Sequence, residues 1–190
     1  MINEIKDKAL ENHIPIICDD SLKYIIDIIK NKNINKMLEI GTAVGYSAIC
    51  FSKYVNHIDT VELNEERYKE AISNIEKCKI LNINVTLSDA YEYMKSLNDK
   101  YDFVFIDAAK GQYLHYLEEA KRLLNDNGII IADNILFKGR VLSDYNEKKH
   151  RTAVNRLREY IEIMKNDTDF KTEIIDIGDG IAVSYKLDKG

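Results

Sequence analysis

Short strand-like runs, of which 37–40, 103–106 and 129–132 are the apolar ones, alternate with helix-like segments along this chain, and that alternation limits the fold more than any other feature. Runs at 37–40, 58–63, 83–87, 103–106 and 129–132 each have the length of one strand. Helices are expected over 46–54, 64–80, 90–97 and 112–124, between those runs. Strands that are apolar along their whole length are typical of a parallel sheet covered by helices. The alternation therefore predicts an α/β fold with a mostly parallel sheet.

The beginning of the chain is predicted to be helical up to about residue 33. Four isoleucines over 25–29 follow a helical spacing, and Asp19, Asp20 or Ser21 is expected to cap a helix there. The chain has one proline, Pro15, and no visible linker or repeat. We therefore expect one domain over residues 1–190, with an N-terminal helical segment over 1–33.

The end of the chain is predicted to add a helix and a hairpin. A turn with the sequence Asn-Asp-Asn-Gly is expected at 125–128, before the fifth strand. A long amphipathic helix is expected at about 147–165. Strands at 170–177 and 181–185, joined by Gly-Asp-Gly, predict a closing antiparallel hairpin that brings the sheet to seven strands.

Charge and cysteine content exclude several classes of protein. The net charge of −5 counts against a protein that coats long nucleic-acid duplexes. Cys18, Cys50 and Cys78 include no C-x-x-C pair, which excludes a disulfide framework and a thiolate zinc site. The first residues are too charged for a signal peptide, and no apolar run is long enough to span a membrane. We expect a cytoplasmic protein with no membrane partner.

Polar residues at the ends of the first three strands indicate a nucleoside site. In a parallel sheet these ends share one edge, where ligands bind. The first strand ends in a glycine turn at Gly41 and Gly45, which taken alone could equally be a tight turn without a ligand. Glu62 ends the second strand, where an acidic residue can accept hydrogen bonds from both ribose hydroxyls. With Asp89 after the third strand, the pattern fits S-adenosylmethionine, which has a ribose and no pyrophosphate.

The ends of the fourth and fifth strands carry oxygen ligands. Asp107 follows the fourth strand, and Asp133 and Asn134 follow the fifth. If these strands are neighbours, two carboxylates and one amide oxygen meet and suit Mg²⁺, Mn²⁺ or Ca²⁺. Ordinary turn residues are the alternative explanation. Lys110, three residues after Asp107, is a candidate proton acceptor or else a surface lysine.

Three blocks of sequence carry a resemblance to a known family. Residues 39–47 (EIGTAVGYS), 101–111 (YDFVFIDAAKG) and 128–139 (GIIIADNILFKG) resemble the cation-dependent class I O-methyltransferases, which include catechol and caffeoyl-CoA methyltransferases. The resemblance covers roughly residues 9–185. Within the family, the forms IDAAKGQY and ADNILFKG look most like bacterial proteins that methylate 5-hydroxyuridine in tRNA. The resemblance implies a Rossmann-like methyltransferase fold, an S-adenosylmethionine cofactor and a homodimer.

The resemblance also implies roles for individual residues. The implied ligands of a divalent cation such as Mg²⁺ are Asp107, Asp133 and Asn134, and Lys110 is the implied base or orienting lysine. Asp107 and Lys110 are therefore the expected catalytic residues. Implied cofactor contacts are Glu39, Gly41, Tyr46, Ser47, Glu62, Asp89, Ala90 and Asp107.

A basic stretch after the metal site bears on the methyl acceptor. Residues 138–158 hold seven basic and two acidic side chains. The candidate phosphate contacts there are Lys138, Arg140, Lys148, Lys149 and Arg151, which could hold a tRNA anticodon loop or could simply be a solvated helix face. We expect methylation of 5-hydroxyuridine at the tRNA wobble position to 5-methoxyuridine. A small catechol-like or hydroxycinnamoyl acceptor is the alternative, and a non-catalytic S-adenosylmethionine-binding module is a second one.

Overall fold

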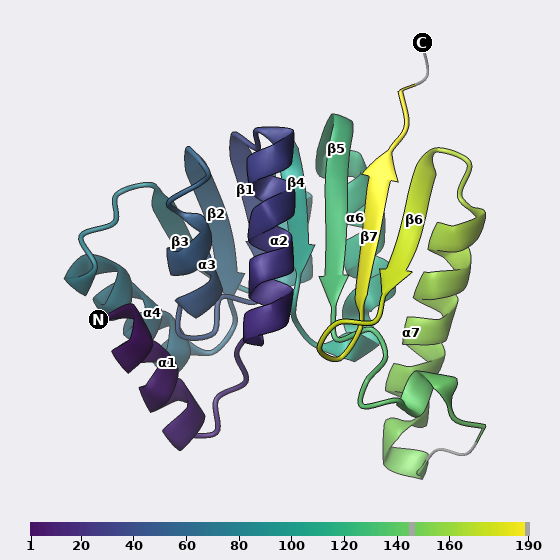
Figure 1. Ribbon diagram of the computed structural model, residues 1–190, viewed down its shortest axis with the longest axis horizontal. Coiled ribbons are helices and arrows are strands. Elements are labelled where there is room, and N and C mark those ends of the chain that lie inside the picture. Colours follow the sequence, from purple (N-terminus) through teal and green to yellow (C-terminus); the bar gives the residue numbers. More distant parts are fainter. Residues whose placement is uncertain (145–146, 189–190) are drawn as a thin grey trace. The chain divides into compact units, whose positions relative to one another are not determined.

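The computed structural model describes residues 1–144 and 147–188 and divides the chain into two compact units, Met1–Tyr93 and Met94–Gly190. Each unit contains strands with helices packed against them (Figure 1). The boundary falls within helix α5 (Ala90–Ser96). The single domain expected over residues 1–190 stays a prediction.

The first unit is built on three parallel strands. The order is β3 (Ile83–Leu87), β2 (His57–Glu62) and β1 (Lys36–Ile40), so β2 is central. The unit's other helices are α1 (Ile2–Glu11), α2 (Asp19–Lys32), α3 (Tyr46–Phe51) and α4 (Glu65–Lys77). Asn64 caps α4 by accepting a hydrogen bond from the backbone N–H of Arg67 at 2.9 Å, as an N-cap residue should.

The N-terminal segment over 1–33 is helical, as expected, and it consists of two helices with a break between them. Helix α1 ends at Glu11 and α2 begins at Asp19. Pro15 disfavours the helical conformation of the residue before it and has no N–H to donate, so the chain breaks around it. The predicted caps Asp19, Asp20 and Ser21 are wrong, since Cys18 is the N-cap and makes no side-chain capping bond.

The second unit pairs two parallel strands with an antiparallel hairpin. Strand β5 (Leu124–Asp133) lies parallel to β4 (Tyr101–Ile106) and antiparallel to β7 (Ile181–Lys186), which pairs with β6 (Phe170–Ile175). The helices are α6 (Tyr113–Leu123), which packs on β4 and β5, and α7 (Lys148–Asn166), which packs on α6 and β6. Single 3₁₀ turns, η1 (Lys110–Gln112) and η2 (Arg140–Leu142), occur in the connections.

The helix expected over 46–54 ends earlier than predicted, at Phe51.

The turn expected at 125–128 lies inside β5. Leu124 already pairs with Tyr101, so the strand begins before the predicted turn. Asn125 donates a side-chain hydrogen bond to Asp102 at 2.7 Å, which holds the irregular start of β5 against β4. Tertiary pairing therefore overrides the local turn preference of Asn-Asp-Asn-Gly.

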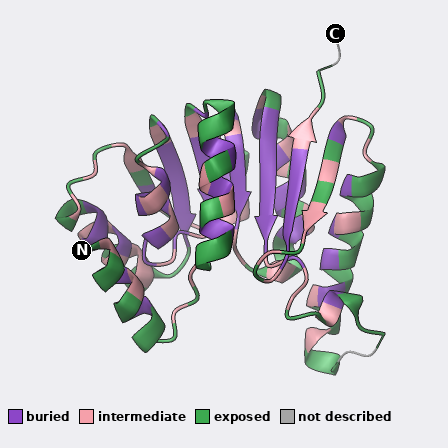
Figure 2. Ribbon diagram, in the orientation of Figure 1, coloured by how far each residue is buried: buried purple, intermediate pink, exposed green. Residues whose placement is uncertain are grey.

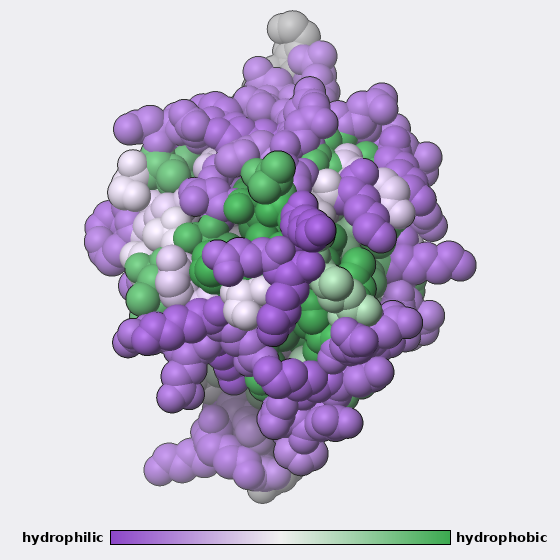
Figure 3. All heavy atoms as spheres, turned by 90° about the vertical axis from the view of Figure 1, so that its left-hand side faces the viewer, coloured by the Kyte–Doolittle hydropathy of each residue, from purple (hydrophilic) through white to green (hydrophobic). Residues whose placement is uncertain are grey.

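The seven strands give a mixed, mostly parallel sheet with a C-terminal antiparallel hairpin, which confirms the predicted fold class. Most residues of β1, β2, β4, β5 and β7 are buried, whereas β3 and β6 are largely intermediate or exposed (Figure 2). The face of the first unit drawn in Figure 3 is mainly hydrophilic, with apolar residues grouped toward its middle. Among the described residues, no helix has both the length and the apolar character needed to cross a membrane.

Gly180 is a position where only glycine fits, and we expect Gly180→Ala to destabilise the protein. Its φ of +81° is left-handed, and a Cβ there would lie 2.3 Å from Cγ of Leu136. Gly139 is the matched control, because its φ is +73° but no atom lies within 4 Å of an added Cβ. Urea unfolding should show a loss of about 1–2 kcal/mol for Gly139→Ala and about 2–5 kcal/mol for Gly180→Ala. Equal losses would contradict the steric explanation.

Candidate active site

The glycine turn after β1 has a backbone that few other sequences allow. Gly41, Ala43 and Gly45 have φ angles of +103°, +47° and +83°. The N–H groups of Gly41 and Thr42 both donate to the carbonyl of Val61 at 3.1 Å, which holds the turn against the end of β2. A φ near +100° is open to glycine alone, so the turn leaves a bare backbone for a ligand to approach.

Glu62 is held beside this turn by two backbone donors. Its Oε2 accepts from the N–H of Ala43 and its Oε1 accepts from the N–H of Asn64, each at 2.8 Å. A carboxylate has about four acceptor positions, so two remain for hydroxyl donors. Glu62 therefore fits the role of ribose acceptor that its position predicted.

Glu39 lies beneath the turn and is fully buried. Its two oxygens accept hydrogen bonds from the hydroxyls of Ser47, at 2.5 Å, and Thr60, at 2.6 Å. Thr60 also shares a hydrogen bond with Thr42 in the turn, at 2.7 Å. Glu39 and Ser47, both expected at the cofactor, thus lie together and connect the start of α3 to β1 and β2. Thr60 belongs to the same network, and no sequence motif singled it out.

Three further predicted cofactor residues, Tyr46, Asp89 and Ala90, lie in the first unit, and Asp107 lies in the second. Tyr46 opens α3, and burial raises the pKa of its hydroxyl to about 12, so it stays protonated. Asp89 is exposed and accepts from the N–H of Glu92 at 3.1 Å, which makes it the cap of α5. Ala90 is the first residue of that helix.

The predicted metal residues come together in the second unit because β4 and β5 are parallel neighbours. Ile106 lies opposite Ala132, so the next residues, Asp107 and Asp133, leave the two strands at the same edge. Asn134 lies between their carboxylates. Its side-chain Nδ2 donates to Asp107 at 3.2 Å and its backbone N–H donates to Asp133 at 2.7 Å.

The two carboxylates are short of positive charge. Burial raises the pKa of Asp107, although Lys110 and the hydrogen bond from Asn134 oppose the rise. Burial and the charge of Asp107 raise the pKa of Asp133 to about 7. Burial raises the pKa of both acids, and a cation that replaces their protons stabilises such a site.

The donor set fits a hard divalent cation. Asp107, Asp133 and Asn134 offer carboxylate and amide oxygens, which Mg²⁺, Mn²⁺ and Ca²⁺ prefer. The amide of Asn134 presents its oxygen to the same place when it turns about its last torsion. Within residues 1–144 and 147–188, no three His, Cys, Asp or Glu side chains gather as metal ligands. The candidate site therefore depends on the amide as third ligand.

Lys110 and two aromatic rings border the carboxylates. The Nζ of Lys110 lies 5.8 Å from the ring centre of Tyr113 and 5.9 Å from that of Phe137, within the range of cation–π attraction. Tyr113 is fully buried, and its hydroxyl donates to the backbone carbonyl of Asp133 at 2.8 Å. Sequence reasoning missed both aromatic residues, although Tyr113 lies only three residues beyond Lys110.

The loop after Asn134 is unusual in its backbone. Asn134, Phe137 and Lys138 all have positive φ, between +49° and +58°, which costs free energy in residues other than glycine. The β6–β7 turn holds this loop, because the N–H groups of Leu136 and Lys138 donate to the backbone and side-chain oxygens of Asp179. Asp179 had not been predicted to support the site.

The predicted phosphate contacts lie in this loop, in the 3₁₀ turn η2 and at the start of α7. Arg140 is half-buried, 5.2 Å from the ring of Phe137. Lys138 is exposed in the loop, and Lys148, Lys149 and Arg151 are exposed at the start of α7. Lys149 pairs with Glu147 at 3.0 Å.

Comparison with known proteins gives these features a family. A sequence model described as O-methyltransferase matches residues 3–187, through both units. The chain belongs to the O-methyltransferase family. The methyltransferase is 32% identical to a caffeoyl-CoA O-methyltransferase candidate from Staphylococcus aureus, with a TM-score of 0.92 over 98% of this chain and 92% of the other.

Two further relatives agree with this membership. A caffeoyl-CoA O-methyltransferase from Populus kitakamiensis is 26% identical over 88% of this chain and 77% of its own. An O-methyltransferase from Bacillus cereus, solved with S-adenosylhomocysteine, shares the fold with 22% identity and a TM-score of 0.88 over 98% and 90% of the two chains. The protein is an S-adenosylmethionine-dependent O-methyltransferase, which confirms the predicted enzyme class and leaves the non-catalytic alternative without support.

The raised pKa of Asp133 predicts how stability depends on pH when no metal is present. In the unfolded chain this carboxyl has a pKa of about 3.9, and in the folded protein about 7. The folded state therefore prefers the protonated form, and this contribution is full below about pH 4 and lost as the pH rises through 7. Measured in EDTA by urea unfolding, the stability of the wild type relative to Asp133→Asn should fall over that window. A constant difference would contradict the buried acid pair.

Proposed function

We propose that this methyltransferase transfers the methyl group of S-adenosylmethionine to a hydroxyl that has a second oxygen beside it, with a divalent cation at Asp107, Asp133 and Asn134. The acceptor we propose is a small catechol-like or hydroxycinnamoyl compound. The observation that carries the proposal is the buried acid pair with its amide neighbour, at the end of two parallel strands. Relatives named caffeoyl-CoA O-methyltransferase support this acceptor class.

Binding of the methyl donor falls to the first unit. Glu62 would accept hydrogen bonds from the ribose, and the glycine turn would let the nucleoside approach the backbone. The network of Glu39, Ser47 and Thr60 keeps the turn and the start of α3 in place. The O-methyltransferases from Bacillus cereus and Streptomyces achromogenes were solved with S-adenosylhomocysteine and S-adenosylmethionine, which supports the same donor here.

The chemistry requires little beyond a deprotonated acceptor in line with the sulfonium. When bound, a divalent cation lowers the pKa of a coordinated hydroxyl. Lys110 would receive the hydroxyl proton at Nζ, the oxygen would form a bond to the methyl carbon, and the carbon–sulfur bond would break to leave S-adenosylhomocysteine. The hydroxyl of Tyr113 holds Asp133 in position by donating a hydrogen bond to its backbone carbonyl. Burial and the two carboxylates raise the pKa of Tyr113 well above 10, so the hydroxyl keeps the proton that it donates.

Asp133→Ala should abolish turnover and leave donor binding within about two-fold of the wild type, because Asp133 lies outside the donor unit. Methyl transfer to a catechol with Mg²⁺ gives the first quantity, and calorimetric titration with S-adenosylhomocysteine gives the second. EDTA should inhibit the wild type to the same extent. Turnover that survives in the variant or in EDTA would contradict the metal assignment.

A second acceptor class is tRNA carrying 5-hydroxyuridine, whose O5 lies beside the O4 carbonyl. It is favoured by the basic stretch at 138–158, since phosphate binding needs such charge. Part of that charge is already engaged. Arg156 pairs with Glu159 at 3.0 Å, and Arg158 donates to the carbonyls of Val141 and Ser143. We therefore place the small acceptor first.

Reversing two exposed charges separates the two acceptors. If tRNA is the substrate, the double variant Lys148→Glu and Arg151→Glu should lower activity on tRNA by roughly ten-fold or more and spare a catechol, because only the polyanion needs these side chains. Mass spectrometry of tRNA nucleosides reads the first activity, and labelled methyl transfer reads the second. No loss on tRNA, or equal losses on both, would remove tRNA binding by this stretch.

A further inference from the structure

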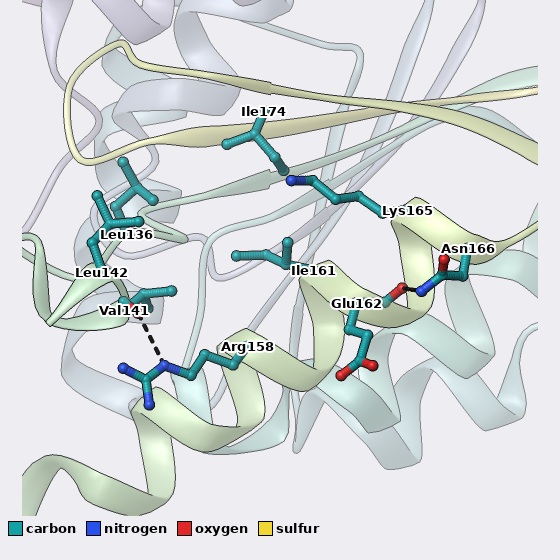
Figure 4. A pocket seen from close by; sticks show the side chains of 9 residues that line it. All are labelled: Leu136, Val141, Leu142, Arg158, Ile161, Glu162, Lys165, Asn166 and Ile174. Carbon is teal, nitrogen blue, oxygen red and sulfur yellow. Dashed lines mark hydrogen bonds between the residues drawn. The ribbon is translucent and has the colours of Figure 1, made fainter. Parts of the chain in front are cut away.

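We propose that a groove in the second unit binds a small amphiphilic anion, an apolar group that carries one carboxylate or sulfonate. The groove lies between α7, β6 and the loop that follows Asn134, and its volume is about 420 Å³ (Figure 4). Sites for small molecules have volumes of this order. The proposal does not depend on which acceptor is methylated.

The floor and walls of the groove are apolar. Figure 4 shows Leu136, Val141 and Leu142 on one side and Ile161 and Ile174 on the other. Leu142 is 74% exposed. An apolar ligand would cover these side chains and remove them from water, which is favourable in proportion to the area buried. The lining therefore accounts for the apolar part of the ligand.

The charges around the groove select an anion. Lys165 extends from α7 across the groove, so that its ammonium lies next to Ile174, whereas the carboxylate of Glu162 points away (Figure 4). Among residues 1–144 and 147–188, no acidic group pairs with Lys165. Arg158 is held in the wall by its donation to Val141 at 2.9 Å. An anionic group on the ligand would give Lys165 the charged partner that this part of the chain does not supply.

The groove touches the loop that carries a predicted metal residue. Leu136 is two residues beyond Asn134, and its backbone N–H donates to the carbonyl of Asp179 at 2.9 Å. Its side chain also occupies the space that a Cβ on Gly180 would need. A ligand in the groove would therefore contact the same loop that the β6–β7 turn holds from the other side.

The probe for this site is 8-anilinonaphthalene-1-sulfonate, an aromatic anion that fluoresces on leaving water. The chain has no tryptophan, so protein emission does not obscure the signal. We expect one saturable site per chain, unaffected by saturating S-adenosylhomocysteine. Lys165→Glu and Leu142→Glu should each weaken binding by roughly ten-fold or more, and the neutral analogue N-phenyl-1-naphthylamine should bind the wild type correspondingly less.

Lys77→Glu is the matched control. Lys77 and Lys165 are each the basic residue in the last turn of a helix, and Lys77 lies in the first unit. This control should bind the probe like the wild type, and circular dichroism should show every variant folded.

Three outcomes would overturn the proposal. Unchanged affinity in Lys165→Glu or Leu142→Glu would remove the groove as the site. Displacement of the probe by S-adenosylhomocysteine would place it at the methyl donor's site. Probe binding that falls as the protein concentration rises would show that a second copy of the chain occupies the groove.

Discussion

Two parallel strands that end side by side impose the constraint on which this site depends. The pairing of β4 with β5 brings Asp107 and Asp133 to one edge, and burial keeps water from screening their charges. Alone, such a pair costs free energy, because buried like charges repel. The fold accepts this cost and holds the pair with Asn134 between the carboxylates and Tyr113 beneath them. That arrangement is explained if a divalent cation completes it.

Nucleoside binding in the first unit has different requirements. A neutral nucleoside is bound mainly by hydrogen bonds and by close approach to the protein backbone, and less by charge. Under the proposed function, the glycine turn and Glu62 would supply both, and the buried Glu39 holds the start of α3 next to the turn. The candidate sites follow the chain order: the proposed donor residues come with the first three strands, and the proposed metal residues come with the next two. The O-methyltransferase family match spans both parts.

Much of this could be predicted from the sequence, because strand ends in a parallel sheet share an edge. The sequence therefore predicts that Asp107, Asp133 and Asn134 meet at this edge, and the structure brings them together. Tyr113 and Asp179 could not be predicted, since their roles depend on which backbone atoms α6 and the β6–β7 turn happen to face. The break at Pro15 had a local signal, and the start of β5 at Leu124 did not, because strand pairing decided it.

The central claim is that the acid pair binds a divalent cation, and calorimetric titration with Mg²⁺ tests it most directly. We predict one ion per chain at about pH 8 and affinity roughly ten-fold weaker at about pH 6, where the proton on Asp133 must first leave. Binding should vanish in Asp107→Ala. The account would be contradicted if the wild type gave no heat of Mg²⁺ binding. It would also be contradicted if the Mg²⁺ affinity were the same in Asp107→Ala as in the wild type and the same at both pH values.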